Sequence, residues 1–178
     1  MEQKNLFEIG DYLEGMGIMT LEELKKRFQL NVAISTFTIE VPKVSLADAI
    51  EAGSYEWVGD GFNEDTYPSV PTDFCKKEVT LFWFNRLMSF ANVRADMNEA
   101  GFGPAPLREL LAFGTTYPKL QREYPIIALG RLPCDSHGRC LVPELWHLDG
   151  KRCLYSLAHV GDRRGYWRGY YRFLAVPK

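Results

Sequence analysis

The alternation of apolar and polar residues predicts the first strand of the chain at residues 32–41. This run is rich in β-branched side chains, which favour strands, and Pro42 predicts its end because proline cannot donate to a sheet ladder. Two further runs fit the same element type. KEVTLFWFNR at 77–86 predicts a buried strand, and SYEWV at 54–58 predicts a short one.

Apolar residues at helical spacing, flanked by capping residues, predict three helices in the middle of the chain. The first lies between residues 45 and 53, with Ser45 as its cap and a glycine at its end. The second follows Ser89 and ends at residue 101. The third lies in GPAPLRELLAFG at 103–114, with two prolines near its first turn, and is expected to end at Gly114.

The last third of the chain carries only strand patterns. IIALGRL, CLVPELWHL, KRCLYSLAHV and GYWRGYYRFLAV are separated by turn residues, as in an antiparallel meander. The dipeptide Asp149–Gly150 between the middle two is the strongest short hairpin signal. A two-residue turn there fixes the register, which places Glu144 opposite Tyr155 and Cys140 opposite His159.

These elements together predict an α+β fold, with N-terminal helices followed by a mostly antiparallel sheet that ends in a C-terminal β-meander. Within residues 1–30, Thr20 and Glu23 form a capping box, which predicts a separate N-terminal helical segment. Residues 31–178 are then a single α+β domain, long enough to bury its own core.

The composition is typical of a globular protein. Hydrophobic residues make up 46% of the chain and charged residues 25%. No apolar run reaches the length of a transmembrane helix, and the acidic start lacks the pattern of a secretory signal. The four cysteines are irregularly spaced, which does not indicate a disulfide framework. We therefore expect a cytoplasmic protein with reduced thiols and no membrane contact.

The net charge of −2 hides an asymmetry between the two halves of the chain. Residues 1–100 carry 9 basic and 17 acidic side chains, whereas residues 101–178 carry 12 and 6. Either the two halves pack together, within one chain or in a dimer, or the basic half faces an anionic partner. The first interpretation is favoured, because nucleic-acid-binding domains are usually strongly basic and this chain has a pI near 6.0.

Three segments resemble a set of uncharacterised bacterial hypothetical proteins. They are GSYEWV at 53–58, LRELLAFGTTYPKLQREYPIIALG at 107–130 and YRFLAV at 171–176. The resemblance covers the chain from about residue 45 to its end. No activity is known for that set, so the resemblance implies neither a substrate nor a site.

One cluster of side chains has the residue types of a metal site. LPCDSHGRC at 132–140 holds Cys134, His137 and Cys140, and the predicted register adds His159. Two cysteines and two histidines can bind zinc tetrahedrally. Structural zinc sites, however, usually begin with cysteines separated by two to four residues. A tight turn with ordinary cysteines is the simpler interpretation, and we predict no cofactor.

The same segment raises a second catalytic hypothesis. Cys140 would be a nucleophile and His159 its base, with Asp135 or Glu144 as the group that orients the imidazole. The sequence does not place either carboxylate beside the histidine.

The last predicted strand is the best candidate for recognition. Its alternation puts Trp167, Phe173 and Ala175 on the core side. The predicted binding residues lie on the opposite face or in the turn before it: Arg163, Arg164, Tyr166, Arg168, Tyr170 and Arg172. Tyrosine and arginine are enriched at protein interfaces, and aromatic residues interleaved with arginine also bind single-stranded nucleic acid.

The sequence therefore predicts a binding or interaction module without catalytic activity, which recognises a protein partner or a second copy of itself through this face. Two alternatives stay open. One is a zinc- or thiol-dependent enzyme centred on Cys140 and His159, and the other is single-stranded nucleic-acid binding by the same basic face.

Overall fold

The computed structural model describes residues 33–68, 74–134, 136–137, 139–160 and 166–178. The strands are β1 (Ala33–Val41), β2 (Trp57–Val58), β3 (Cys75–Trp83), β4 (Met88–Ser89), β5 (Phe102–Pro104), β6 (Ile126–Ala128), β7 (Arg139–Leu148), β8 (Lys151–Val160), β9 (Tyr166–Trp167) and β10 (Arg172–Pro177). The helices are α3 (Leu46–Ala52), α4 (Phe90–Glu99), α5 (Leu107–Thr116) and the 3-10 helix η1 (Leu120–Arg122). Within the described residues, none of them is long and apolar enough to span a membrane.

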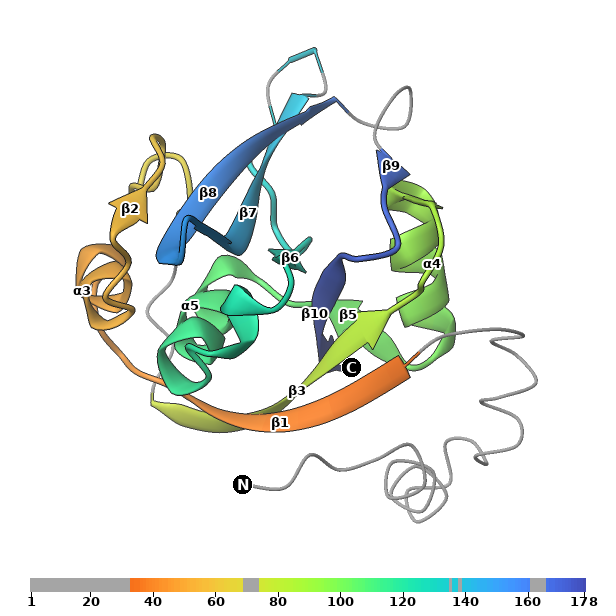
Figure 1. Cartoon of the computed structure of the whole chain (residues 1–178), viewed down its shortest axis with the longest axis horizontal. Coiled ribbons are helices and arrows are strands. Elements are labelled where there is room, and N and C mark those ends of the chain that lie inside the picture. The colour runs from red at the N-terminus through yellow and green to blue at the C-terminus, as the bar shows by residue number, and fades with distance from the viewer. Residues whose placement is uncertain (1–32, 69–73, 135, 138, 161–165) are drawn as a thin grey trace.

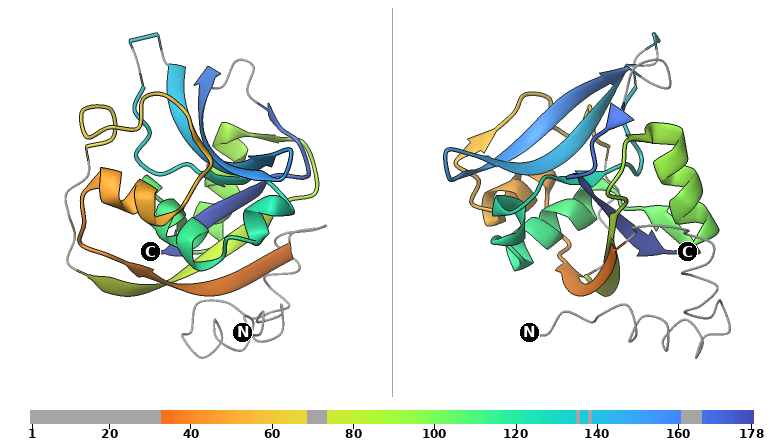
Figure 2. Two further views of the ribbon diagram at one scale, coloured as in Figure 1. Left: turned by 60° about the vertical axis from the view of Figure 1, so that its left-hand side comes forward. Right: turned by 45° about the vertical axis from the view of Figure 1, so that its right-hand side comes forward.

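Eight of the described strands form one sheet in the order β1-β3-β10-β6-β7-β8-β2, with β5 paired to β10 (Figure 1). The sheet is mixed, because β10 pairs with β6 and β2 pairs with β8 in parallel, whereas its other pairs are antiparallel. β4 and β9 form a separate antiparallel pair. The β7–β8 hairpin projects away from the β1–β3 ribbon, with α5 packed between them (Figure 2).

The predicted order of elements is wrong. In the described chain β1 precedes every helix, and the sheet is mixed rather than mostly antiparallel. The final strand does not extend the β6–β7–β8 meander but inserts between β3 and β6. Phe173, Leu174 and Ala175 are consecutive and buried, as in a central strand covered on both faces. The helices predicted within residues 1–30 lie outside the described residues.

Several local predictions are confirmed, because they depend on turn and cap chemistry alone. β1 ends immediately before Pro42. The hydroxyl groups of Ser45 and Ser89 accept hydrogen bonds from backbone N–H groups three residues later, which caps α3 and α4. Asp149 and Gly150 have φ angles of 49° and 78°, as a two-residue hairpin turn requires.

The register predicted from this turn is also confirmed. β7 and β8 pair over ten residues each, with Glu144 opposite Tyr155 and Cys140 opposite His159. Side chains of directly opposed residues lie on the same face of the sheet. The hairpin therefore places Glu144 on the face that also carries Trp146 and Tyr155.

Gly114 does not end the third helix, since α5 continues to Thr116. A Cβ atom at this position would lie 2.4 Å from Tyr55 Oη and 2.8 Å from Leu145 Cδ1. The glycine therefore allows α5 to pack closely against the β7–β8 hairpin, and its role is packing rather than termination.

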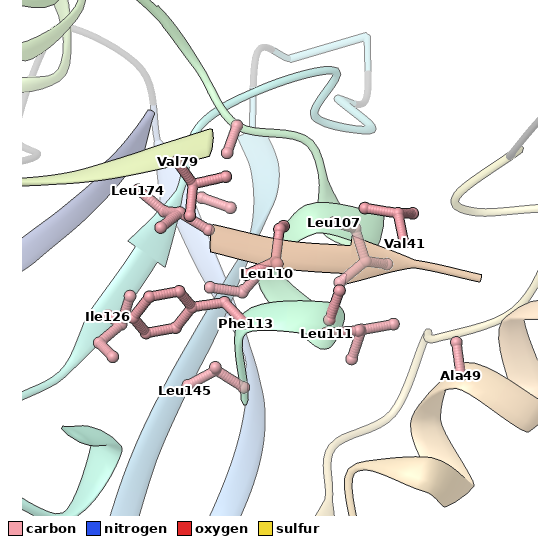
Figure 3. Packing of buried hydrophobic residues seen from close by; sticks show 14 of the residues in the cluster. Val41, Ala49, Val79, Leu107, Leu110, Leu111, Phe113, Ile126, Leu145 and Leu174 are labelled. Atoms are coloured by element: carbon pink, nitrogen blue, oxygen red, sulfur yellow. The ribbon is translucent and has the colours of Figure 1, made fainter. Parts of the chain in front are cut away.

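Two clusters of buried side chains meet at β10. One packs β3 and β10 against α4 and includes Phe82, Val93 and Phe173. The other packs the sheet against α5 and includes Phe113 and Leu174 (Figure 3). Because successive residues of a strand point to opposite faces, β10 contributes to both clusters and connects them.

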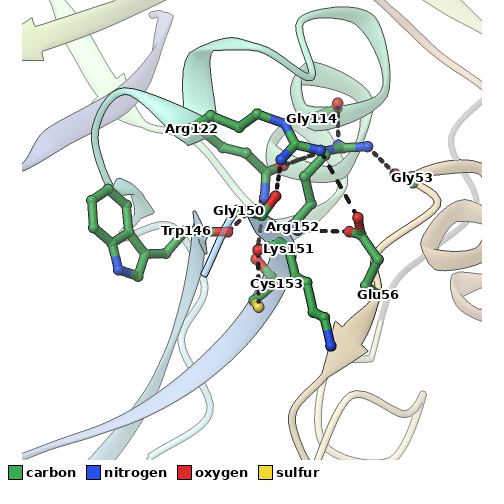
Figure 4. A network of polar contacts seen from close by, with 10 residues as sticks. Gly53, Glu56, Gly114, Arg122, Trp146, Gly150, Lys151, Arg152 and Cys153 are labelled. Atoms are coloured by element: carbon green, nitrogen blue, oxygen red, sulfur yellow. Dashed lines mark hydrogen bonds and ion pairs between the residues drawn. The ribbon is translucent and has the colours of Figure 1, made fainter. Parts of the chain in front are cut away.

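A buried arginine ties the β7–β8 hairpin to three neighbouring segments (Figure 4). Arg152 Nη1 donates to the carbonyl of Gly53 at 2.6 Å, and Nη2 donates to the carbonyl of Gly114 at 2.7 Å. Nε and Nη2 also donate to Gln121 Oε1 in η1, at 3.1 Å and 3.0 Å. The guanidinium lies 5.0 Å from the centroid of the Tyr55 ring. Its buried charge is thus surrounded by acceptors from the C-terminal cap of α3, from α5 and from η1.

Replacing this arginine should destabilise the fold strongly. Arg152→Met leaves the acceptors on Gly53, Gly114 and Gln121 buried without their donors, so we expect the free energy of unfolding to fall by about 3–5 kcal/mol. Urea unfolding followed by circular dichroism measures the loss. The matched control is Arg86→Met, which removes a more exposed ion pair to Asp96 and should cost less than about 1 kcal/mol. Equal losses for the two variants would contradict the role given to Arg152.

Candidate functional site

A cavity of about 500 Å³ opens between the β7–β8 hairpin, the segment after η1 and the turn before β10. Its size falls within the range of small-molecule sites. We call it the aromatic cavity. It is lined by Glu123, Tyr124, Pro125, Glu144, Trp146, Tyr155, Leu157, Tyr170 and Tyr171.

The hairpin supplies one wall of the aromatic cavity. Glu144 and Trp146 are two residues apart on β7, so their side chains share a face. Tyr155 lies directly opposite Glu144 on β8, and Leu157 is two residues further along the same face. The hairpin register alone therefore brings a carboxyl, an indole, a phenol and an aliphatic side chain together.

Another part of the lining comes from the turn that carries Tyr170 and Tyr171, which we call the tyrosine turn. Their rings stack on each other, with centroids 4.7 Å apart. The backbone before them is held against the end of β3, since the Trp83 indole N–H donates to the carbonyl of Gly169. A Cβ on Gly169 would come within 2.9 Å of the Arg86 backbone nitrogen, so this close approach requires glycine.

Arg172 holds this turn in place from its C-terminal side. Its guanidinium lies 4.3 Å from the ring centroids of both Trp83 and Tyr124. Its Nη1 also donates to the carbonyl groups of Tyr170 and Tyr171, at 3.0 Å and 3.4 Å. Arg172 therefore links β3, the tyrosine turn and the Tyr124 wall of the aromatic cavity.

Glu144 is the unusual member of the cavity lining. Its side chain belongs to a residue that is only 5% exposed, and among the described residues no group donates a hydrogen bond to its carboxyl. Burial raises the pKa of Glu144 to about 8, because a charged carboxylate loses its hydration there. At pH 7 about nine-tenths of the molecules therefore carry this side chain as a neutral acid.

The charge of the aromatic cavity is one-sided. It contains the carboxyl groups of Glu144 and Glu123, and none of the described lining residues is basic. Burial raises the pKa of Tyr155 and of Tyr171, and the nearby Glu144 charge raises both further. The cavity thus combines aromatic rings with negative charge and offers no cationic group to an anion.

The predicted Tyr/Arg face is only partly present. The expected single strand is interrupted by the turn at 168–171, which separates β9 from β10. Tyr166 is 60% exposed on β9, Arg168 is exposed in the turn, and Tyr170 is 50% exposed at the cavity. Arg172 is held between two rings instead of facing solvent. Arg163 and Arg164 lie outside the described residues.

The structure joins Cys134 and Cys140 in a disulfide, so the expectation of reduced thiols is wrong for these two residues. The sulfur atoms needed for the zinc and nucleophile hypotheses are therefore not available in this form. His137 is exposed in the intervening turn, and the side chain of His159 lies outside the described part of the chain. Among the residues described, no group of three or more His, Cys, Asp or Glu side chains could hold a metal ion.

Comparison with known proteins gives no information about the aromatic cavity. No family model, curated protein or solved structure matches the chain. The case for the site therefore rests on its side chains, their burial and their charges.

One feature of the sequence indicates this site. Glu144 is the acidic residue in the largely apolar strand CLVPELWHL, on the same face as Val142 and Trp146. A carboxyl on the apolar face of a strand is buried or lines a cavity. The alternation of the strand and the hairpin register together could have identified its position beside Tyr155, but not the tyrosine turn that also lines the cavity.

The disulfide predicts the number of thiols. After denaturation without a reductant, the protein should show two reactive thiols, those of Cys75 and Cys153, and four after reduction. Titration with Ellman's reagent counts them, and elemental analysis of the same sample measures zinc. The variant Cys134→Ser should show three thiols without reduction. Four thiols in the unreduced protein together with bound zinc would contradict the disulfide and support the zinc hypothesis.

The buried carboxyl predicts a pH dependence of stability. The pKa of Glu144 is about 8 in the folded protein against 4.5 for the ordinary group. The folded state therefore holds this proton more tightly, and stability is lost as the pH rises from about 4.5 to 8. Glu144→Gln replaces the carboxyl by an amide that does not ionise, so the variant does not lose this stability as the pH rises. Its stability relative to the native protein should increase by about 4 kcal/mol across this window.

Urea unfolding of both proteins at several pH values measures this difference, in which the contributions of other groups cancel. Glu123→Gln changes an exposed carboxyl at the same cavity and serves as the control, with a much smaller change across the window. A difference for Glu144→Gln that is independent of pH would show that Glu144 is not desolvated.

Proposed function

We propose that the protein is a binding module that takes part of a ligand into the aromatic cavity. The observation that carries this proposal is the Glu144 carboxyl, which lines the cavity without a hydrogen-bond donor among the described residues. A buried polar group without a partner costs free energy, and such groups in pockets are typical of functional sites. A ligand that pairs with the carboxyl offsets this cost.

The C-terminal segment remains the recognition element, but its residues have roles that differ from those predicted from the sequence. Tyr170 contributes through the aromatic cavity, whereas Arg172 acts through the rings and carbonyl groups that it contacts. The inserted group belongs to a small molecule or to a side chain of a protein partner, which includes a second copy of this chain. Nucleic acid is disfavoured at this position, because Glu144 and Glu123 repel phosphate groups.

Nuclear magnetic resonance of protein labelled with 5-fluorotryptophan tests the proposal with ligands of any chemical class. Of the four tryptophans, Trp146 lines the aromatic cavity, and Trp146→Phe assigns its signal. We expect cavity-binding members of a library of cationic, neutral and anionic fragments to shift this signal. Tyr170→Ala should weaken such binding at least about tenfold, the order of loss expected for an aromatic anchor.

The matched control is Tyr166→Ala, since Tyr166 is similarly exposed but does not line the cavity, and fragment binding should be unchanged. A library without any fragment that shifts the Trp146 signal would contradict the proposal. So would a loss of binding in Tyr166→Ala with full binding in Tyr170→Ala, because it would place recognition on the face predicted from the sequence.

A further inference from the structure

We infer that the aromatic cavity selects an alkylated ammonium group and uses the carboxylate of Glu144 as the counter-ion. This inference rests on the binding function proposed above and names the class of ligand. It is carried by three properties of the cavity: its charge, its aromatic rings and its aliphatic surface.

The charge of the cavity excludes anions and favours cations. Glu144 and Glu123 line it, and no described lining residue is basic. Arg172, a cation next to the cavity, is already placed between Trp83 and Tyr124 and donates to backbone carbonyl groups. The Glu144 carboxylate therefore has no cationic partner among the described residues, and a bound cation would supply one.

The walls of the cavity suit a cation that carries alkyl groups. Aromatic rings present a negative face, which attracts cations, and quaternary ammonium groups are commonly bound among several rings. Tyr124 already contacts the guanidinium of Arg172 at 4.3 Å, so a ring of this wall engages a cation within the protein itself. Pro125 and Leu157 add aliphatic surface, which matches the methyl groups of an alkylated amine.

A primary ammonium group uses less of this surface. It can donate to the Glu144 carboxylate, but it carries no alkyl groups on the charged nitrogen to contact the rings and aliphatic side chains of the lining. The methyl groups of an alkylated ammonium contact that surface while the positive charge lies beside the Glu144 carboxylate. The volume of about 500 Å³ leaves room for substituents beyond the ammonium group, as in a small molecule or a methylated lysine side chain.

Binding of such a cation should be coupled to loss of a proton. The titratable groups that line the cavity with Glu144 are Tyr155 from β8, Tyr170 and Tyr171 from the turn before β10, and Glu123 and Tyr124 from the segment after η1. The charge of the exposed Arg168 lowers the pKa of Tyr171, against the larger effect of burial. Burial raises the pKa of Tyr124, Tyr155 and Tyr171, so these three hydroxyl groups stay neutral at neutral pH.

Glu144 is thus the group that changes charge near neutral pH. With its pKa at about 8, the ionised fraction increases from about one-tenth at pH 7 to about nine-tenths at pH 9. Since the cation pairs with the ionised form, its affinity should rise about tenfold over this range.

Choline and its neutral isostere 3,3-dimethylbutan-1-ol test the inference on the full chain. Calorimetry at pH 7 and pH 9, together with the Trp146 fluorine signal, measures binding of both probes. We expect choline to bind at least about tenfold more tightly than the alcohol at pH 9, to weaken toward pH 7, and to release a proton at pH 7. N-acetyl-trimethyllysine methyl amide, compared with choline, distinguishes a peptide side chain from a free small molecule.

Glu144→Gln should remove the preference for choline and its pH dependence but keep binding of the neutral alcohol, which also shows that the variant folds. Glu40→Gln removes an exposed carboxyl on β1 and should behave as the native protein. Equal affinities for choline and the alcohol in the native protein would overturn the cation inference and leave the proposed binding function intact. If neither these probes nor any fragment shifts the Trp146 signal, both the inference and the proposed function fail.

Discussion

The insertion of the last strand between β3 and β6 is the constraint on which the rest of the structure depends. β10 is buried on both faces, with Phe173 in the cluster beneath α4 and Leu174 in the cluster beneath α5. It is also the only described strand that joins the β1–β3 ribbon to the β6–β7–β8 half of the sheet. The residues immediately before it are consequently fixed where the two halves meet. The tyrosine turn of the aromatic cavity is a result of this placement.

Two buried ionisable side chains on the β7–β8 hairpin have opposite energetic roles. Arg152 is buried among acceptors from three segments, so its charge stabilises the fold through these bonds. Glu144 is equally buried, yet the described residues provide no donor for it, and burial raises the pKa of its carboxyl instead. The first side chain is explained by the fold alone. The second destabilises the fold at neutral pH, and the ligand that we propose would account for it.

The elements that could be predicted from the sequence are those that local chemistry determines. Ser45, Ser89 and the Asp149–Gly150 turn act on their immediate neighbours, so caps, helix starts and the hairpin register followed from them. The position of β10 could not be predicted in this way, because alternation within a strand does not identify its neighbours. The run RFLAV was nevertheless a usable signal, since a strand that is apolar at successive positions is covered on both faces.

Errors at the candidate site have equally specific causes. The pattern from Tyr166 to Arg172 was interpreted as one strand with an exposed Tyr/Arg face, but Gly169 approaches the backbone at Arg86 and the chain turns there. Arg172 is then directed between Trp83 and Tyr124 rather than toward solvent. The disulfide between Cys134 and Cys140 likewise depends on how the turn folds, since the separation of six residues fits a turn with free thiols as well.

The hairpin register also explains why the carboxyl of Glu144 lies in the cavity. Side chains alternate between the two faces of β7, so Glu144 and Trp146 share one face while Leu145 is buried on the other, against α5. A shift of one residue would move Glu144 into that apolar cluster and Leu145 into the cavity. The positive φ angles at Asp149 and Gly150 prevent this shift, because they fix the two-residue turn. A surface turn some distance along the hairpin thereby determines that the aromatic cavity contains a carboxyl.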